Sequence, residues 1–306
     1  MSHRISRSRF VAGFVLLAGV AAPAVAAVRV VTTTTDLASI ARAVGGDRVE
    51  VDSIAAGNQD PHFVDAKPSF LVKLKKADLF VQVGLELEIG WAPNLLANSR
   101  NAKIQSGGPG FVDASAGIAP LQIPTSADRS AGDIHPYGNP HYWLDPVNGK
   151  QIAANIAAGL ERVDPDGAES YRANLAAFDA RIDQAVVGWT AKMAAVAGVP
   201  IVAYHNSWPY FERRFGFKVV GFVEPKPGIP PSGKYVAELA ESMKQQKVGV
   251  ILMSTFYDQK TAELVARLSG AKVVTLSNSV DGLPGADDYF KLFDVDVGRL
   301  VDALKP

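Results

Sequence analysis

The chain has 306 residues, and its 31 basic and 31 acidic residues give a formal net charge of zero. Without a basic stripe or a long block of like charge, the sequence argues against a nucleic-acid-binding protein and against a charged disordered tail. Apolar residues make up 48% of the chain, enough for a sizeable core, and at this length two lobes of about 100–150 residues each are expected. Cysteine is absent, so the fold cannot depend on disulfides.

The first 26 residues predict a secretory signal peptide. Three arginines precede a short apolar stretch at residues 10–20, and Ala24-Val25-Ala26 supplies the small residues of a cleavage site. An uncleaved membrane anchor is the alternative, but this apolar stretch is too short to span a bilayer comfortably. We therefore expect cleavage after Ala26 and export of the mature chain to the periplasm, with no lipid anchor on an N-terminal cysteine.

The first part of the mature chain alternates strand-like and helix-like segments, which indicates βαβ units and a parallel sheet. The expected strands lie at residues 28–32, 49–54 and 79–83, and the expected helices lie at residues 37–44 and 68–76. Between Gly107 and Pro140 the composition changes to Gly, Pro, Ser, Ala and Asp with little periodicity. So long an irregular stretch in a compact protein is usually functional or mobile.

A long amphipathic helix is expected from about Gly167 to Ala197. Large apolar side chains recur there at steps of three and four residues: Tyr171, Leu175, Phe178, Ile182, Val186, Trp189 and Met193. A helix of about 30 residues would be about 45 Å long, which is the width of two lobes rather than one. A surface helix of the C-terminal lobe is the alternative.

After Gly198 the alternation of strands and helices restarts. The expected strands lie at residues 199–204, 218–222, 248–253 and 272–276, and the expected helices lie at residues 208–215, 235–245, 261–268 and 289–304. We therefore predict an α/β protein with two lobes, each a mostly parallel sheet flanked by helices. The predicted division is a signal peptide at 1–26, an N-terminal lobe at 27–163, a long connecting helix at 164–198 and a C-terminal lobe at 199–306.

Three of the four histidines in the mature chain lie in short polar loops beside aromatic residues, prolines or carboxylates. They are His62 in Asp60-Pro61-His62-Phe63, His141 in Asn139-Pro140-His141-Tyr142-Trp143, and His205 in Tyr204-His205-Asn206-Ser207-Trp208. Neutral imidazole is the commonest metal ligand in proteins and suits zinc well. His62 and His205 also follow predicted strands, and open α/β sheets bind ligands outside the carboxyl ends of strands. From the residues alone, one shared metal site and three separately packed loop histidines remain open alternatives.

Polar residues near these histidines have two candidate roles. They either hydrogen-bond to the imidazole rings and fix their tautomers, or cap helices. These residues are Asp60, Asp65, Asp145 and Asn206. We expect capping for Asp145, which stands directly before a proline at a favourable helix start. The fourth mature histidine, His135, lies in the irregular stretch, where it either contacts metal transiently during capture or release or is an ordinary solvated residue.

At these loops the chain resembles the zinc and manganese solute-binding proteins of bacterial ABC importers, the ZnuA/TroA-like family. The resemblance covers essentially the whole mature chain. Its most specific segments are Asp60-Pro61-His62, Lys75 to Phe80 leading to Gly84 and Glu88, Asn139 to Pro146, and Tyr204 to Phe211. The stretch from Gly221 to Ser232 looks like the AztC-type zinc branch of the family.

This resemblance implies two α/β lobes joined by one long rigid helix, with the metal buried between them. The family ligands carry over onto His62, His141 and His205. The fourth family ligand is a carboxylate after the last strand of the C-terminal lobe, and direct matching places Asn278 there. We expect Asp281, three residues later, to reach the ion, with Glu224 or a water molecule as alternatives.

Three imidazoles with one carboxylate favour Zn²⁺ in a four-coordinate site, and Mn²⁺, which prefers more oxygen ligands, is the main rival. The resemblance implies a periplasmic monomer that captures zinc as cargo and delivers it to an ABC-type permease in the inner membrane. A periplasmic zinc metallochaperone is a further candidate partner. The alternative class is a zinc hydrolase or lyase, since three histidines and a water also form catalytic sites. The sequence has no HExxH helix and no nucleophile elbow, so we expect no enzymatic activity.

Overall fold

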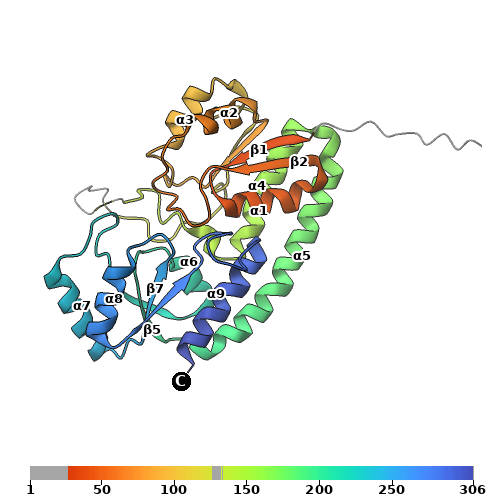
Figure 1. Cartoon of the computed structure of the whole chain (residues 1–306). Coiled ribbons are helices and arrows are strands. Elements are labelled where there is room, and N and C mark those ends of the chain that lie inside the picture. Colours follow the sequence, from red (N-terminus) through yellow and green to blue (C-terminus); the bar gives the residue numbers. More distant parts are fainter. Residues whose placement is uncertain (1–26, 126–131, 133, 306) are drawn as a thin grey trace, which may run out of the picture.

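The structure, a computed structural model, describes residues 27–125, 132 and 134–305. The predicted signal peptide and residues 126–131 and 133 of the irregular stretch lie outside the described residues. Two α/β lobes, here named the N-lobe (27–163) and the C-lobe (199–305), are joined by a long helix (Figure 1). The predicted fold class is confirmed.

Each lobe contains a four-stranded sheet in which all neighbouring strands are parallel. The N-lobe strands, in the sheet order β2-β1-β3-β4, are β1 (Val28–Thr32), β2 (Val49–Ser53), β3 (Leu79–Gln82) and β4 (Phe111–Asp113). The C-lobe strands, in the sheet order β6-β5-β7-β8, are β5 (Pro200–Ala203), β6 (Lys218–Phe222), β7 (Val250–Ser254) and β8 (Lys272–Leu276). The two sheets therefore have the same strand order, and the loops after β2 and β5 meet between the lobes.

Helices cover the sheets and connect the strands. Their bounds are α1 (Thr35–Gly45), α2 (Pro68–Lys76), α3 (Ala92–Ser99), α4 (Asn148–Val163), α5 (Ala168–Met193), α6 (Pro209–Phe215), α7 (Gly233–Gln245), α8 (Gln259–Ser269) and α9 (Tyr289–Leu304). Several begin at a side chain that accepts backbone N–H groups of the first turn, as Thr34 does for α1, Asp258 for α8 and Asp288 for α9. Such caps satisfy donors that a helix start otherwise leaves unpaired.

Helix α5 runs along both lobes (Figure 1) and matches the long helix predicted from the apolar stripe. Its 26 residues span about 39 Å. Tyr171, Phe178, Ile182, Trp189 and Met193 are buried along one face. The C-terminal half of α5 packs on α9, where the Trp189 and Phe293 rings lie 5.1 Å apart between centroids. One helix thus contributes to the cores of both lobes.

Direct contacts also hold the lobes together beside the sheet ends. The Thr35 hydroxyl at the start of α1 donates to the Val280 carbonyl at 2.6 Å, and the Val280 N–H donates to the Asp36 carboxylate at 2.9 Å. On the other side, Asp145 forms an ion pair with Arg214 of α6 at 2.7 Å. These contacts fix the loops that carry the polar residues between the lobes.

Two elements were not anticipated from the sequence. β4 lies inside the stretch 107–140, and as a three-residue edge strand with one buried side chain it has too little apolar pattern to predict. α3 has a proline in its first turn and two asparagines, which weakens its helical signal. Among the described residues, no helix is both long and apolar enough to cross a bilayer.

Candidate metal-binding site

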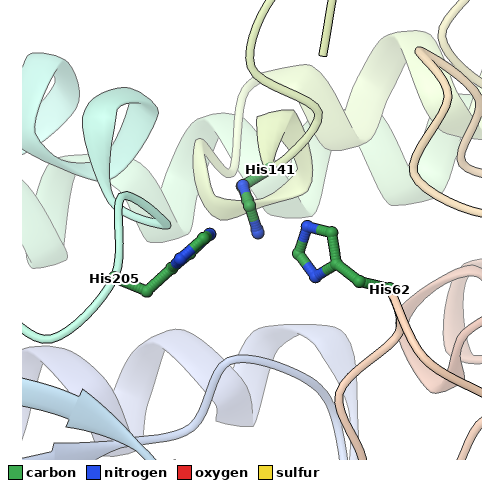
Figure 2. Close-up of side chains that lie close together, drawn as sticks. All are labelled: His62, His141 and His205. Carbon is green, nitrogen blue, oxygen red and sulfur yellow. The ribbon is translucent and has the colours of Figure 1, made fainter. Parts of the chain in front are cut away.

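Three imidazole rings meet between the lobes. The side chains of His62, His141 and His205 point toward one another from three different loops (Figure 2). Their ring centroids are 5.2 Å apart for His62 and His141, and 5.6 Å apart for each of the other two pairs. One ligand nitrogen from each ring lies within 4.8 Å of the other two. We call these three residues the histidine cluster.

Buried packing fixes each of the three loops. The His62 loop is anchored by Trp91, whose indole N–H donates to the Pro61 carbonyl at 2.9 Å. His141 directly precedes a short 3₁₀ turn (Tyr142–Leu144), and its ring packs against the buried Trp143 at 5.3 Å. His205 follows β5 and stacks on Tyr257, with 5.6 Å between ring centroids. The rings are therefore held in place by neighbours from both lobes.

Each ring is also held through its Nδ1 atom. His62 Nδ1 lies 2.7 Å from the Asp60 carboxylate, and His205 Nδ1 lies 2.6 Å from the Glu224 carboxylate. His141 Nδ1 lies 3.0 Å from Asn139 Oδ1, which also accepts the His141 backbone N–H and is therefore an oxygen. Because these partners are acceptors, Nδ1 carries the proton in each ring and Nε2 keeps its lone pair.

Burial favours the uncharged form of His141. The pKa of His141 is well below its ordinary value because the ring is fully buried and because His62 and His205 lie close by. The pKa of Asp60 is lowered despite its burial, since the carboxylate is hydrogen-bonded to His62. The buried Nε2 atoms of His62 and His141 have no hydrogen-bond partner among the described residues. Neutral rings with free lone pairs are suited to bind a cation such as zinc.

His135 lies beside the cluster without belonging to the three-nitrogen group. Its ring centroid is 5.3 Å from that of His62, and its ring hydrogen-bonds to the backbone of Leu85 and Glu86. Burial, and then the proximity of His62 and His205, lowers its pKa to about 3. The ring lines a cavity of about 960 Å³ that also reaches His62. His135 thus lines the same cavity as His62, beside the histidine cluster.

The structure does not bring Asp281, the expected fourth ligand, to the histidine cluster. Its side chain is exposed and faces a separate surface hollow lined by residues 53–58. The Val280 N–H is bound by Asp36 of the other lobe, and the chain then turns outward with Asp281 at φ 61°. Asn278, three residues earlier, is 1% exposed instead.

The polar residues expected behind the histidines have different roles. Asp60 does hold an imidazole, whereas Asp65 is exposed. Asp145 accepts the Val147 N–H at the start of α4, but its main partner is Arg214. Asn206 donates through its side chain to Gln122.

Sequence reasoning missed the roles of Asn139, Glu224 and Tyr257 behind the rings. The sequence suggests Glu224 only as an alternative ligand, whereas in the structure it is the partner of His205. The signal lay in the strand register: Ala203 pairs with Phe222, which places His205 opposite Glu224 just beyond the strand ends.

The chain is similar to known proteins over most of its length. The family model described as "ZnuA: Zinc-uptake complex component A periplasmic" matches residues 30–303. The chain is 27% identical to the manganese ABC transporter substrate-binding lipoprotein PsaA of Streptococcus pneumoniae, and 26% identical to the iron ABC transporter substrate-binding lipoprotein MtsA of Streptococcus pyogenes serotype M1. Each alignment covers 90% of this chain and 88% of the relative.

Solved structures show the same likeness. A crystal structure of ZnuA superposes with a TM-score of 0.78 and 26% identity, covering 91% of this chain and 100% of the other. The laminin-binding adhesin of Streptococcus agalactiae superposes with a TM-score of 0.73 and 26% identity, covering 90% of this chain and 99% of the other. The chain therefore matches relatives named for manganese and iron in sequence, and a ZnuA structure in fold.

Proposed function

Because the chain belongs to the ZnuA family of metal-binding proteins from ABC importers, we propose that it captures zinc in the periplasm and delivers it to an ABC-type permease for import. The observation that carries this proposal is the convergence of three histidine rings whose Nδ1 atoms are all engaged. Only the Nε2 atoms are left to face one another, as a cation site requires. The proposed ligands are His62, His141 and His205.

Zinc is favoured by the type of donor atoms. The cluster offers three imidazole nitrogens, and among the described residues no carboxylate belongs to the same compact group. Manganese and iron(II) sites prefer more oxygen ligands, whereas imidazole suits zinc. Manganese remains the rival cargo, because a relative of this chain is named for manganese.

The proposed role is binding and transfer, not catalysis. The cluster is buried between two lobes, with His141 only 1% exposed, and this suits retention of an ion until a partner opens the site. We propose that the exported protein acts as a monomer, that the partner is an inner-membrane permease, and that a periplasmic metallochaperone is a candidate donor.

The test is metal analysis of the mature chain purified without chelator, followed by competition titrations of zinc against manganese. We expect about one zinc per chain and a clear preference for zinc. A double variant, His62→Ala with His141→Ala, serves as the matched control and should retain no stoichiometric metal. Retention of manganese in preference to zinc would show that zinc is not the cargo. Equal metal content in the wild type and the double variant would show that the histidine cluster is not the binding site.

A further inference from the structure

The carboxylate of Glu224 binds two different parts of the chain. Its Oε2 atom lies 2.6 Å from Nδ1 of His205, and its Oε1 atom accepts the backbone N–H of Gly228 at 3.0 Å. The side chains of Glu224 and His205 are only 11% and 8% exposed, whereas Gly228 lies at the surface. One largely buried carboxylate therefore joins a proposed metal ligand to an exposed segment of the chain.

The partner of His62 is arranged differently. A single oxygen of Asp60, Oδ1, accepts the backbone N–H of His62 at 3.0 Å and also lies 2.7 Å from Nδ1 of the same residue. Both bonds are therefore local. Glu224, by contrast, is 19 residues from His205 in sequence, and its two bonds use separate oxygens. The acceptor that orients the His205 ring consequently depends on contacts made elsewhere in the chain.

Gly228 belongs to a turn that is rich in proline. We call residues 225–231 the proline loop, and its prolines are Pro225, Pro227, Pro230 and Pro231. Within this loop the Ile229 N–H donates to the Lys226 carbonyl at 3.0 Å, and Gly228 has φ 76°, a conformation that favours glycine. Because proline fixes φ, so short a turn has little internal freedom. A displacement of the proline loop should therefore change the bond from Gly228 to Glu224, because the loop itself cannot absorb it.

The proline loop also contacts the N-lobe beside the histidine cluster. A Cβ atom at Gly132 would lie 2.3 Å from the Pro227 carbonyl oxygen, so the backbone of the irregular stretch passes very close to this loop. Pro227 and Ile229 line the cavity of about 960 Å³ together with His62 of the N-lobe. Since the loop extends from the C-lobe and contacts the N-lobe, a change in the spacing of the two lobes changes its position.

We propose that Glu224 is a positioning residue that couples the metal site to the proline loop. Zinc at His205 stabilises the loop against the N-lobe, and displacement of the loop weakens the hold on zinc. The inference rests on the proposed function and adds to it a route by which contact at the surface releases the ion. A metal-bound imidazole is held by the acceptor at its other nitrogen, so an acceptor that loses its own support loosens the ligand. Coupling between two sites is reciprocal, so each direction can be measured.

The first direction is tested by hydrogen exchange of the mature chain, with and without saturating zinc, in wild type, Glu224→Gln and Asp60→Asn. An amide has one acceptor oxygen, so Glu224→Gln cannot serve both His205 and Gly228. Asp60→Asn keeps the one oxygen that its two bonds use, and it is the matched control for loss of charge. We expect zinc to slow exchange in the proline loop about fivefold or more in wild type and in Asp60→Asn, and to have little effect in Glu224→Gln.

The second direction is tested by the rate of zinc loss to excess chelator. Gly228→Pro removes the N–H and cannot adopt φ 76°, so it displaces the proline loop without changing a ligand. We expect zinc to dissociate about fivefold faster from Gly228→Pro than from wild type, and Gly228→Pro should add nothing in a Glu224→Gln background. Circular dichroism reports whether each variant is folded.

The coupling would be overturned by equal effects of zinc on the proline loop in wild type and Glu224→Gln, including no effect in either. Loss of the zinc effect in Asp60→Asn, or zinc loss from Gly228→Pro at the wild-type rate, would overturn it as well. If Glu224→Gln binds no zinc, the rate in Gly228→Pro alone decides. Any of these results with normal zinc binding by the wild type leaves the proposed function intact, whereas a wild-type chain that binds no zinc overturns both.

Discussion

Two buried polar groups at the junction of the lobes invite comparison. The histidine cluster lies on one side, and Asp36 of α1 and Asp296 of α9, here named the carboxylate pair, flank the loop after β8 on the other. One oxygen of Asp36 accepts the Val280 N–H at 2.9 Å, and one oxygen of Asp296 accepts the Ser277 N–H at 2.6 Å. The remaining oxygen of each has no partner among the described residues.

Burial favours the uncharged form of both groups. For a histidine this form is the deprotonated one, and for an aspartate it is the protonated one. Burial lowers the pKa of His141, so the ring stays neutral and keeps a lone pair for a cation. It raises the pKa of Asp36 to about 7 and that of Asp296 well above its usual range, so these acids tend to hold a proton and lose their charge. We therefore expect a cation to bind the imidazoles, and we interpret the carboxylate pair as a structural feature of the lobe junction.

The largest expected effect concerns the histidine cluster alone. His62→Ala, His141→Ala and His205→Ala should each weaken zinc at least tenfold, about 1.4 kcal/mol, because each removes one of three nitrogen donors. The free energy of unfolding of the metal-free chain should change far less. Competition titration against a zinc chelator, paired with urea unfolding, measures both quantities. Wild-type affinity in two of the three variants would show that the cluster is not the site.

Zinc affinity should also decrease at least tenfold when the pH is lowered from 7 to 5. Imidazole must be deprotonated to coordinate, and an ordinary histidine titrates near pH 6.5, so protons compete with the ion over this range. Because the pKa of His141 is depressed, that ring should remain a ligand throughout the range. Titrations corrected for free zinc at each pH check the prediction. A flat profile would indicate a site built from oxygen donors.

The carboxylate pair should control stability rather than metal binding. The folded-state pKa of Asp36, about 7, lies above its ordinary value of 3.8, so its contribution to stability is complete below about pH 4 and is lost as pH rises through 7. Asp36→Asn removes this titration and keeps an oxygen for the Val280 N–H. Relative to wild type, its unfolding free energy should therefore rise between pH 5 and pH 8, by on the order of 1 kcal/mol or more.

Urea unfolding of the metal-free chain at the two pH values measures this difference. Asp47→Asn, a change at an exposed carboxylate outside the carboxylate pair and its loop, is the control. The same pH dependence in wild type and Asp36→Asn would show that Asp36 does not titrate in this range. Weakened zinc binding in Asp36→Asn would contradict the expectation that the carboxylate pair affects stability and not metal binding.

The smallest equilibrium effect is expected at His135. Its ring is held by the backbone of Leu85 and Glu86 and lines the cavity beside His62. His135→Ala should change the rate of zinc uptake in stopped-flow measurements more than it changes affinity, since a residue used only in passage adds little to the final shell. A loss of affinity as large as that of His62→Ala would make His135 a true ligand.

Much of the fold follows from local pattern. The apolar stripe of α5 repeats over about six turns, and a signal of that length outweighs local ambiguity. Strands such as β8 are short apolar runs bounded by polar residues, and their positions were predicted to within one or two residues. β4 and α3 escaped prediction because their stability comes from neighbouring elements and not from their own sequence.

At the site, the sequence predicted the rings but not what surrounds them. Each histidine lies in a short loop whose neighbouring residues are characteristic, so it could be predicted as a ligand from the local sequence. The partnership of His205 with Glu224 depends on which strand lies beside β5, and the outward turn at Asp281 depends on a bond from Val280 to Asp36 in the other lobe. Contacts between residues so far apart in sequence are set by the tertiary fold.

The indole of Trp143 has an optical consequence. Its ring packs 5.3 Å from the ring of His141, and its N–H donates to the main-chain carbonyl of Asn278, so a change at the histidine cluster alters the surroundings of the indole. Its emission should respond to occupancy of the site: a paramagnetic ion such as Cu²⁺ should quench it strongly, and closed-shell Zn²⁺ should shift it by changing its polar surroundings. The chain has four tryptophans, and replacement of Trp143 by Phe would assign the signal. The protein thus carries an intrinsic fluorophore suited to following cargo exchange without a label.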